Sequence, residues 1–280
     1  MKNTLPLLSE MILPSFGTII KGIKIKKKGI CIKKNFENVT IDSSSLQSYK
    51  NFLNWNTDLP LAFFYLMAQR AQTNLMLSSD FTIAIPGLVH VANTLTSLDE
   101  IDKTKPYNLQ AKVEVSYKET GSLIPKFTVD FTQNEKTVIR CESTYVAKRK
   151  GNKKREHIEK EYNDFTDISV SAENWEISKN LGKKYAQASG DKNPIHSSKL
   201  FARIVGFKNP ILQGWYSISR IVKTCETEFN TTFKNIEVEF KSPVFLPSKQ
   251  IAEWYITDER EVIFQVKSDN NKIVLIGKLK

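Results

Sequence analysis

Cysteine is scarce in this sequence, and the few cysteines are not arranged in pairs. The 280 residues include three, Cys31, Cys141 and Cys225, which lie far apart along the chain. An odd number without paired spacing argues against a disulfide framework and against a zinc site, so we expect no bound metal. A reducing cytoplasm is the compartment that fits this cysteine usage best.

Long apolar runs are also missing. No stretch approaches the roughly 18 uninterrupted apolar residues of a membrane-spanning helix. Near the start, Pro6, Glu10 and Pro14 interrupt the apolar segment that a secretory signal needs. Hydrophobic residues make up 40% of the chain and charged residues 25%, a balance typical of soluble globular proteins. We therefore expect a soluble, folded protein with no membrane span.

Acidic residues are outnumbered by basic ones, which gives a formal net charge of +11 and a pI near 9.4. Much of the excess lies in two lysine-rich segments, residues 21–34 and 148–155. These segments fit either a solvated surface or a site that attracts a phosphorylated ligand, such as coenzyme A, or an acidic carrier protein. Nucleic acid is not an expected partner, because the basic residues are not interleaved with aromatic stacking residues and no zinc-finger or helix-turn-helix spacing occurs.

The segment 148–165 divides the chain nearly in half. It is basic, contains Gly151 and Asn152 and has almost no apolar residues, as is typical of a linker between domains. We predict an N-terminal domain at residues 1–147 and a C-terminal domain at residues 166–280. Both halves read in the order helix, loop, long helix and a series of strands, which indicates an internal repeat.

Helical and strand periodicities both occur in the C-terminal half. Ser171 is placed to cap a helix that continues through Ala188, with apolar residues at helical spacing. A longer apolar stripe over residues 211–229 predicts a buried helix. Alternating apolar residues then predict antiparallel strands at 236–240, 252–256, 262–266 and 273–279.

The N-terminal half follows the same pattern less regularly. Apolar residues over 88–95 predict a helix after Pro86, and alternation predicts strands at 113–117, 127–131 and 139–145. Neither half shows the βαβ rhythm of a parallel sheet. The expected fold class is α+β, a double hot-dog with two long central helices, each wrapped by an antiparallel β-sheet.

The most informative segment runs from Tyr185 to His196. Gly190 tolerates the left-handed backbone of a helix end, and Pro194 forces Asn193 into an extended conformation. The resulting turn directs Asp191 and His196 toward a common point. A carboxylate and an imidazole that converge can hold a water molecule between them, which suits addition of water to an activated double bond. Taken alone, a turn of this kind more often has a purely structural role.

This segment is part of a wider resemblance to the MaoC-like hydratase family. The other matching motifs are Ala202, Gly206-Phe207, the segment Asn209 to Gly214, and Phe240-Lys-Ser-Pro243-Val244. Together they span about eighty residues in the family's order. The N-terminal half resembles, more weakly, the degenerate first domain of the two-domain members.

The resemblance implies reversible hydration of trans-2-enoyl thioesters to (R)-3-hydroxyacyl thioesters in fatty-acid metabolism. The substrate would be carried on coenzyme A or acyl carrier protein, and no separate cofactor is expected. Asp191 and His196 match the catalytic pair, and Asn193 matches the residue that orients the loop. Gly214 matches the position whose backbone amide bonds the thioester oxygen. Ser219 matches a position that often lines the site.

Two departures from the family pattern affect the prediction. The family usually has His-Gly where this chain has Gln213-Gly214, so Gln213 either replaces the histidine through its own amide or alters the activity. Trp215 is also bulkier than the residue usual at its position, which would reshape the acyl pocket.

The first half lacks the Asp-x-Asn-Pro-x-His loop, and Asp58-Leu-Pro60 is its nearest remnant. We therefore expect one active site per chain. The longer interval from Pro60 to Pro86 than from Pro194 to Pro210 is interpreted as an apolar insertion, which is either extra core or a roomier acyl pocket. His90 is interpreted as a structural or pocket-wall residue.

Two other functions on the same fold stay open. One is a non-catalytic protein that binds acyl thioesters, and the other is a thioesterase. The assembly state is also open, with a homodimer among the alternatives.

Overall fold

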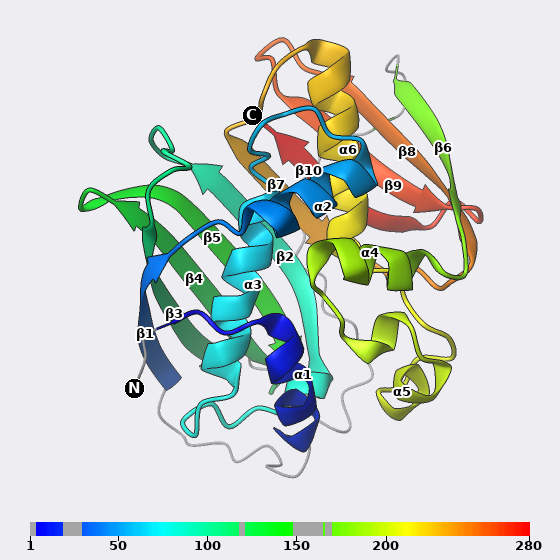
Figure 1. Ribbon diagram of the computed structural model, residues 1–280. Coiled ribbons are helices and arrows are strands. Elements are labelled where there is room, and N and C mark those ends of the chain that lie inside the picture. Colours follow the sequence, from blue (N-terminus) through cyan, green and yellow to red (C-terminus); the bar gives the residue numbers. More distant parts are fainter. Residues whose placement is uncertain (1–3, 19–29, 118–120, 148–164, 166–169) are drawn as a thin grey trace.

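The computed structural model describes residues 4–18, 30–117, 121–147, 165 and 170–280 (Figure 1). The predicted linker, apart from Phe165, and most of the two lysine-rich segments lie outside the described residues. Within the described ranges, no helix is long and apolar enough to cross a bilayer. Cys31, Cys141 and Cys225 are unpaired, and the last two are buried.

The strands form one sheet of ten, in the order β1-β3-β4-β5-β2-β7-β10-β9-β8-β6. Every neighbouring pair in it is antiparallel. In chain order the strands are β1 (Ile30–Val39), β2 (Leu88–Ser97), β3 (Tyr107–Tyr117), β4 (Leu123–Gln133), β5 (Lys136–Ala147), β6 (Ser171–Ile177), β7 (Asn235–Phe240), β8 (Ser248–Ile256), β9 (Val262–Ser268) and β10 (Ile273–Leu279).

The longer helices α3 and α6 lie against the same side of this sheet, and α1, α2, α4 and α5 surround them (Figure 1). The helices are α1 (Leu8–Gly17), α2 (Ser43–Leu53), α3 (Phe63–Met76), α4 (Leu181–Ser189), α5 (Lys199–Ile204) and α6 (Gly214–Phe229). Short 3-10 turns occur at Ile85–Gly87 and Pro194–His196.

The strand order of the first half recurs in the second half. The order β1-β3-β4-β5-β2 has the same connectivity as β6-β8-β9-β10-β7, and the two sets meet where β2 pairs with β7. In each set a long helix, α3 or α6, lies between the first and second strand along the chain. The internal repeat indicated by the sequence is therefore visible in the connectivity of the sheet.

The buried helix predicted from the apolar stripe over residues 211–229 is confirmed as α6. Trp215, Ile218, Val222 and Cys225 recur at helical spacing, and each is at most 4% exposed. Burial of a large apolar side chain contributes roughly 1.5 to 3 kcal/mol, so this stripe holds the helix against the sheet. The helix ends at Asn230, which has the left-handed backbone typical of a helix terminus.

Hydrogen bonds from buried side chains join the two halves. The Tyr49 hydroxyl on α2 donates to Ser219 Oγ on α6 over 2.6 Å. Trp215 Nε1 donates to the Ala62 carbonyl at 2.9 Å, and Trp55 Nε1 donates to Glu226 at 2.8 Å. Burial raises the pKa of Glu226, although the hydrogen bonds it accepts act in the opposite direction. These contacts fix α6 against elements of the first half.

One predicted helix is wrong in its first half, and another is wrong throughout. Ser171–Ile177 is strand β6, paired with β8, and the helix begins only at Leu181. Residues 88–95 belong to strand β2, which pairs with β5 and β7. Their apolar spacing fits a helix, but β-branched residues and pairing on both sides favour a strand.

The predicted insertion between Pro60 and Pro86 is also wrong. That interval contains α3, the counterpart of α6 in the connectivity of the first half. Phe64, Ala68 and Ala71 of α3 are fully buried, and the helix contacts β1, β3 and β4. Pro86 is not the counterpart of Pro210, because Pro86 precedes strand β2 and Pro210 precedes helix α6.

The other predicted elements are confirmed. The strands expected at 113–117, 127–131 and 139–145 are β3, β4 and β5. Those expected from residue 236 onward are β7 to β10.

Candidate active site

Helix α4 delivers the loop that carries the candidate site. The helix ends at Gly190, whose φ of 77° is the left-handed conformation that glycine adopts without steric cost. The Ser189 hydroxyl donates to the Tyr185 carbonyl at 2.8 Å and accepts from the Asp191 amide at 3.2 Å. The helix end therefore sets the direction in which the chain enters residue 191.

Asn193 organises the next turn. Its amide N–H donates to Asp191 Oδ1, and its side-chain Oδ1 accepts from the Ile195 amide, each at 3.3 Å. This second bond caps the 3-10 turn at Pro194–His196. Gly182 of α4 lies so close to this turn that a Cβ there would collide with the His196 carbonyl. Asn193 therefore bonds residues on both sides of it in the loop.

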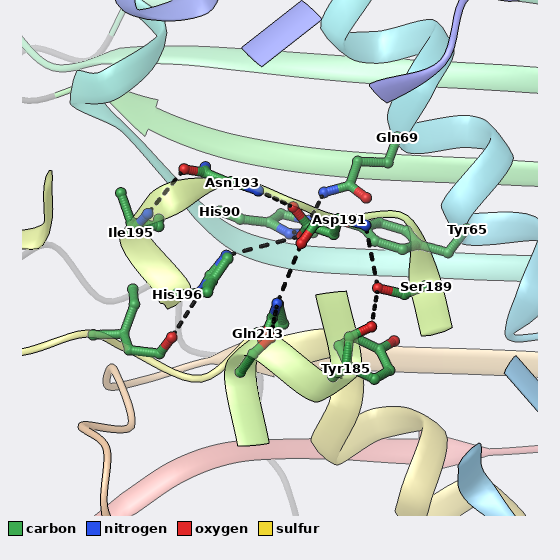
Figure 2. Close-up of polar contacts among 12 residues, drawn as sticks. Tyr65, Gln69, His90, Tyr185, Ser189, Asp191, Asn193, Ile195, His196 and Gln213 are labelled. Atoms are coloured by element: carbon green, nitrogen blue, oxygen red, sulfur yellow. Dashed lines mark hydrogen bonds and ion pairs between the residues drawn. The ribbon is translucent and has the colours of Figure 1, made fainter. Parts of the chain in front are cut away.

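The turn brings Asp191 and His196 together (Figure 2). Asp191 Oδ2 lies 3.8 Å from His196 Nε2, and each residue is only 8% exposed. His196 Nδ1 lies 2.7 Å from the Ile211 carbonyl, which can only accept. Nδ1 must therefore carry a proton, and in the neutral ring Nε2 is the acceptor that faces Asp191.

Gln213 holds the same loop from the start of α6. Its Nε2 donates to the Gly182 carbonyl at 3.0 Å and to the Asp191 carbonyl at 3.3 Å. The residue is 2% exposed, and its Oε1 is buried without a partner among the described residues. The side-chain amide of Gln213 therefore links α4 and the Asp191 loop to the beginning of α6 by hydrogen bonds.

Gly214 and Ser219 lie on α6 in different surroundings. A Cβ on Gly214 would lie 2.6 Å from the Phe240 ring, so any larger residue at this first helical position would require the ring to move. Ser219 donates to the Trp215 carbonyl and accepts from Tyr49, both at 2.6 Å. In the structure, the Ser219 hydroxyl contacts α2 and its own helix rather than the Asp191 and His196 side chains.

One contact was not predicted from the sequence. Gln69 of α3 donates from Nε2 to Asp191 Oδ2 at 3.2 Å, and Figure 2 shows it on the opposite side of Asp191 from Gln213. The two residues are 122 positions apart, and no motif surrounds Gln69. Only the packing of the two halves could reveal this neighbour.

Buried aromatic residues stand near the pair. Burial, followed by the charges of neighbouring groups including Asp191, raises the pKa of Tyr65 well above its usual value. Burial also raises the pKa of Tyr185, again with a contribution from Asp191. Both hydroxyls therefore remain protonated.

His90 stacks on Tyr145 at 4.5 Å between ring centroids, and its Nδ1 lies 3.3 Å from the Tyr65 hydroxyl, which agrees with a structural role.

A cavity of about 240 Å³ reaches Asp191. Most of its walls are apolar, and they come from both halves of the chain. The lining includes Met11, Ile12 and Phe16 of α1, Gln69 and Thr73 of α3, Leu88, and Asn193, Ile195, Val205 and Phe207. A mostly apolar cavity with a few polar groups at one point is typical of small-molecule sites.

The protein has a larger, more open cleft elsewhere, of about 960 Å³. It is lined by Asp58, Asp99, Glu100, Asp102 and neighbouring residues, and it does not include the Asp191 loop. Among the described residues, no group of three or more His, Cys, Asp or Glu side chains could hold a metal ion.

Comparisons with known proteins show similarity to MaoC-like proteins. Residues 153–276 match the family described as MaoC like domain. The chain is 21% identical over 218 residues to 3-hydroxyacyl-thioester dehydratase X of Mycobacterium tuberculosis, covering 76% of each chain. It is 38% identical over 94 residues to the peroxisomal enoyl-CoA hydratase 2 of Arabidopsis thaliana, covering 32% of this chain and 30% of that protein.

The fold is shared with a solved relative. The crystal structure of HtdX from Mycobacterium tuberculosis superposes with a TM-score of 0.69 at 18% identity, covering 88% of this chain and 98% of that one. The architecture is thus hot-dog-like, as in the MaoC-like structures it resembles. The match to the MaoC like domain, over residues 153–276, includes the Asp191 loop and helix α6.

Proposed function

We propose that the protein is a hydro-lyase that reversibly hydrates trans-2-enoyl thioesters to (R)-3-hydroxyacyl thioesters in fatty-acid metabolism. The observation that carries the proposal is the buried pair Asp191 and His196, 3.8 Å apart, inside the part of the chain that matches the MaoC-like domain. The names of the dehydratase and hydratase relatives support the same reaction.

The gap between the two side chains suits a water molecule. At 3.8 Å, Asp191 Oδ2 and His196 Nε2 are too far apart for a direct hydrogen bond. A water oxygen can lie about 2.8 Å from both atoms and donate one hydrogen to each. Both protein atoms can accept, Oδ2 as a carboxylate oxygen and Nε2 because His196 presents its Nδ1 proton to the Ile211 carbonyl. The pair therefore holds the water with its oxygen lone pairs free.

Hydration then proceeds by general base and general acid steps. One member of the pair takes a proton from the water while the oxygen adds to C3 of the enoyl group. The electron pair of the double bond moves toward the thioester oxygen and forms an enolate. The protonated member returns its proton to C2, so one hydroxyl and one hydrogen are added. Dehydration is the reverse.

Gly214 is the proposed donor to the thioester oxygen. The first N–H groups of a helix have no partner within the helix, and the helix dipole favours negative charge at that end. Gly214 begins α6 immediately after Gln213, which contacts the Asp191 carbonyl. Its amide N–H would stabilise the enolate charge as it develops. We assign Asn193 and Gln213 to loop positioning, and Ser219 to support behind the site.

We also propose the finer architecture, a double hot-dog with α3 and α6 as central helices. The repeated strand order and the burial of both helices support it. The proposed domains are 1–147 and 166–280, joined by the linker at 148–165. One active site per chain is expected, because the catalytic loop occurs once.

The substrate would be an acyl-CoA or acyl carrier protein thioester, with no separate cofactor. Lys192, Lys199 and Lys208 are exposed near the Asp191 loop, and such cations attract phosphate groups. Trp215 stacks on Tyr65 at 3.9 Å between centroids, which narrows the space between α6 and α3.

We propose the cytoplasm as the compartment, consistent with three free cysteines.

Turnover of defined thioesters tests the proposal. The purified protein is incubated with crotonyl-CoA and longer enoyl-CoAs, and loss of the conjugated thioester is followed by ultraviolet absorbance. The expected product is the (R)-3-hydroxyacyl thioester, identified by chiral chromatography. Binding without turnover at any chain length would instead indicate an acyl-thioester binding protein, and release of free thiol would indicate a thioesterase.

A further inference from the structure

Gln69 is the side chain of the first half that reaches the candidate catalytic carboxylate. It lies on α3, and its Nε2 is 3.2 Å from Asp191 Oδ2. Gln69, Asp191 and Asn193 line the same cavity. Because an ionised carboxylate only accepts hydrogen bonds, the amide must present its N–H to Asp191.

The contact concerns the oxygen that faces His196. Asp191 Oδ1 is held within the loop by the Asn193 amide at 3.3 Å. Oδ2 is the atom 3.8 Å from His196 Nε2, and Gln69 is its hydrogen-bond donor in the structure. The terminal torsion of an aspartate is broad, so a bond to one oxygen fixes the plane of the group only loosely. A second bond, to Oδ2, fixes that plane.

A neutral hydrogen-bond donor, such as the Gln69 amide, is suited to orient Asp191 Oδ2. A lysine or arginine would form an ion pair and weaken the carboxylate as a proton acceptor, whereas an amide N–H orients the charge without neutralising it. A carboxylate in place of the amide would oppose the ionised form of Asp191.

We propose that Gln69 is a positioning residue that orients Asp191 Oδ2 toward His196, so that the active centre is assembled from both halves of the chain. The inference rests on the proposed hydratase function. It gives the first half, which lacks the catalytic loop, a defined part in the reaction.

Two variants test this role. Gln69→Leu removes the donor, and kcat/KM for enoyl-CoA hydration is expected to fall about 10- to 100-fold, the usual effect of losing a hydrogen bond to a charged group. Gln69→Glu has the same shape but places a second carboxylate beside Asp191. The acidic limb of its pH profile of kcat/KM is expected to move to higher pH by about one unit or more. That shift tests whether residue 69 lies against Asp191, and the fall in kcat/KM of Gln69→Leu tests whether the donor orients the carboxylate.

The matched control is Gln47→Glu on α2, the same change at an exposed position whose side chain bonds Asn51 of the same helix. Circular dichroism checks that each variant folds, and if Gln69→Leu does not, the pH profile of Gln69→Glu decides alone. Wild-type turnover together with an unshifted Gln69→Glu profile would overturn the role of Gln69 and leave the hydratase intact. Absence of turnover in the wild type would overturn the proposed function and this role with it.

Discussion

His90 makes the stability of the protein depend on pH in a way that can be calculated from its surroundings. The ring stacks on Tyr145 and Tyr65, with Phe240 tilted against it at 4.9 Å between centroids. The residue is partly accessible overall, but Nε2 is buried and has no hydrogen-bond partner among the described residues. This burial lowers the pKa of His90 from 6.5 to about 3.

The direction of this pH dependence follows from whether the folded or the unfolded protein binds the proton. Between pH 7 and pH 5 the unfolded chain protonates His90, whereas the folded protein keeps the ring neutral. A folded-state pKa below the unfolded value gives stability that is present above pH 6.5 and is lost as the pH falls toward 3. From pH 7 to pH 5 the loss is about 2 kcal/mol, an upper value because part of the residue is accessible to water.

Denaturant unfolding of the wild type and of His90→Phe at pH 5, 6 and 7 measures this loss. Phenylalanine keeps the stacking on Tyr145 and removes the titrating group. The wild type is expected to lose up to about 2 kcal/mol more than His90→Phe between pH 7 and pH 5, since contributions from the other histidines are common to both proteins. Parallel losses in the two proteins would refute the reasoning.

Two further substitutions test contacts around α6. Tyr49→Phe removes the 2.6 Å bond to Ser219 and should lower the free energy of unfolding by about 1 kcal/mol in denaturant titrations; an unchanged value would mean that the bond adds nothing. Gly214→Ala places a Cβ 2.6 Å from the Phe240 ring, and overpacking of this kind should lower the free energy of unfolding by about 1 to 3 kcal/mol and reduce kcat/KM. Gly17→Ala, where a Cβ would meet open space, is the stability control. Wild-type stability in Gly214→Ala would contradict the close packing.

The parts that sequence could predict are those that depend on nearby residues. The pair Asp191 and His196 lies within one turn, and the helix end, Gly190 and the Asn193-Pro194 step determine its geometry locally. The long stripe of α6 and most of the strands also follow from periodicity, because each buries one face.

The parts that sequence could not predict depend on pairing across the chain. Leu88 to Leu95 fits helical spacing, but partners on both sides, β5 and β7, make it a strand. Ser171 has the residue type of a helix cap, yet it begins an edge strand paired with β8. The Gln69 contact arises from packing between halves, and nothing near residue 69 indicates it.

Replacement of Asp191 is the most direct test of the central claim, that this carboxylate and His196 activate one water molecule. Asp191→Asn keeps the size of the side chain and removes its charge, and hydration of crotonyl-CoA is compared between the variant and the wild type. The expected result is a fall in kcat of about 10² to 10⁴, with the unfolding temperature changed by only a few degrees. A folded Asp191→Asn variant that hydrates crotonyl-CoA at the wild-type rate would contradict the account.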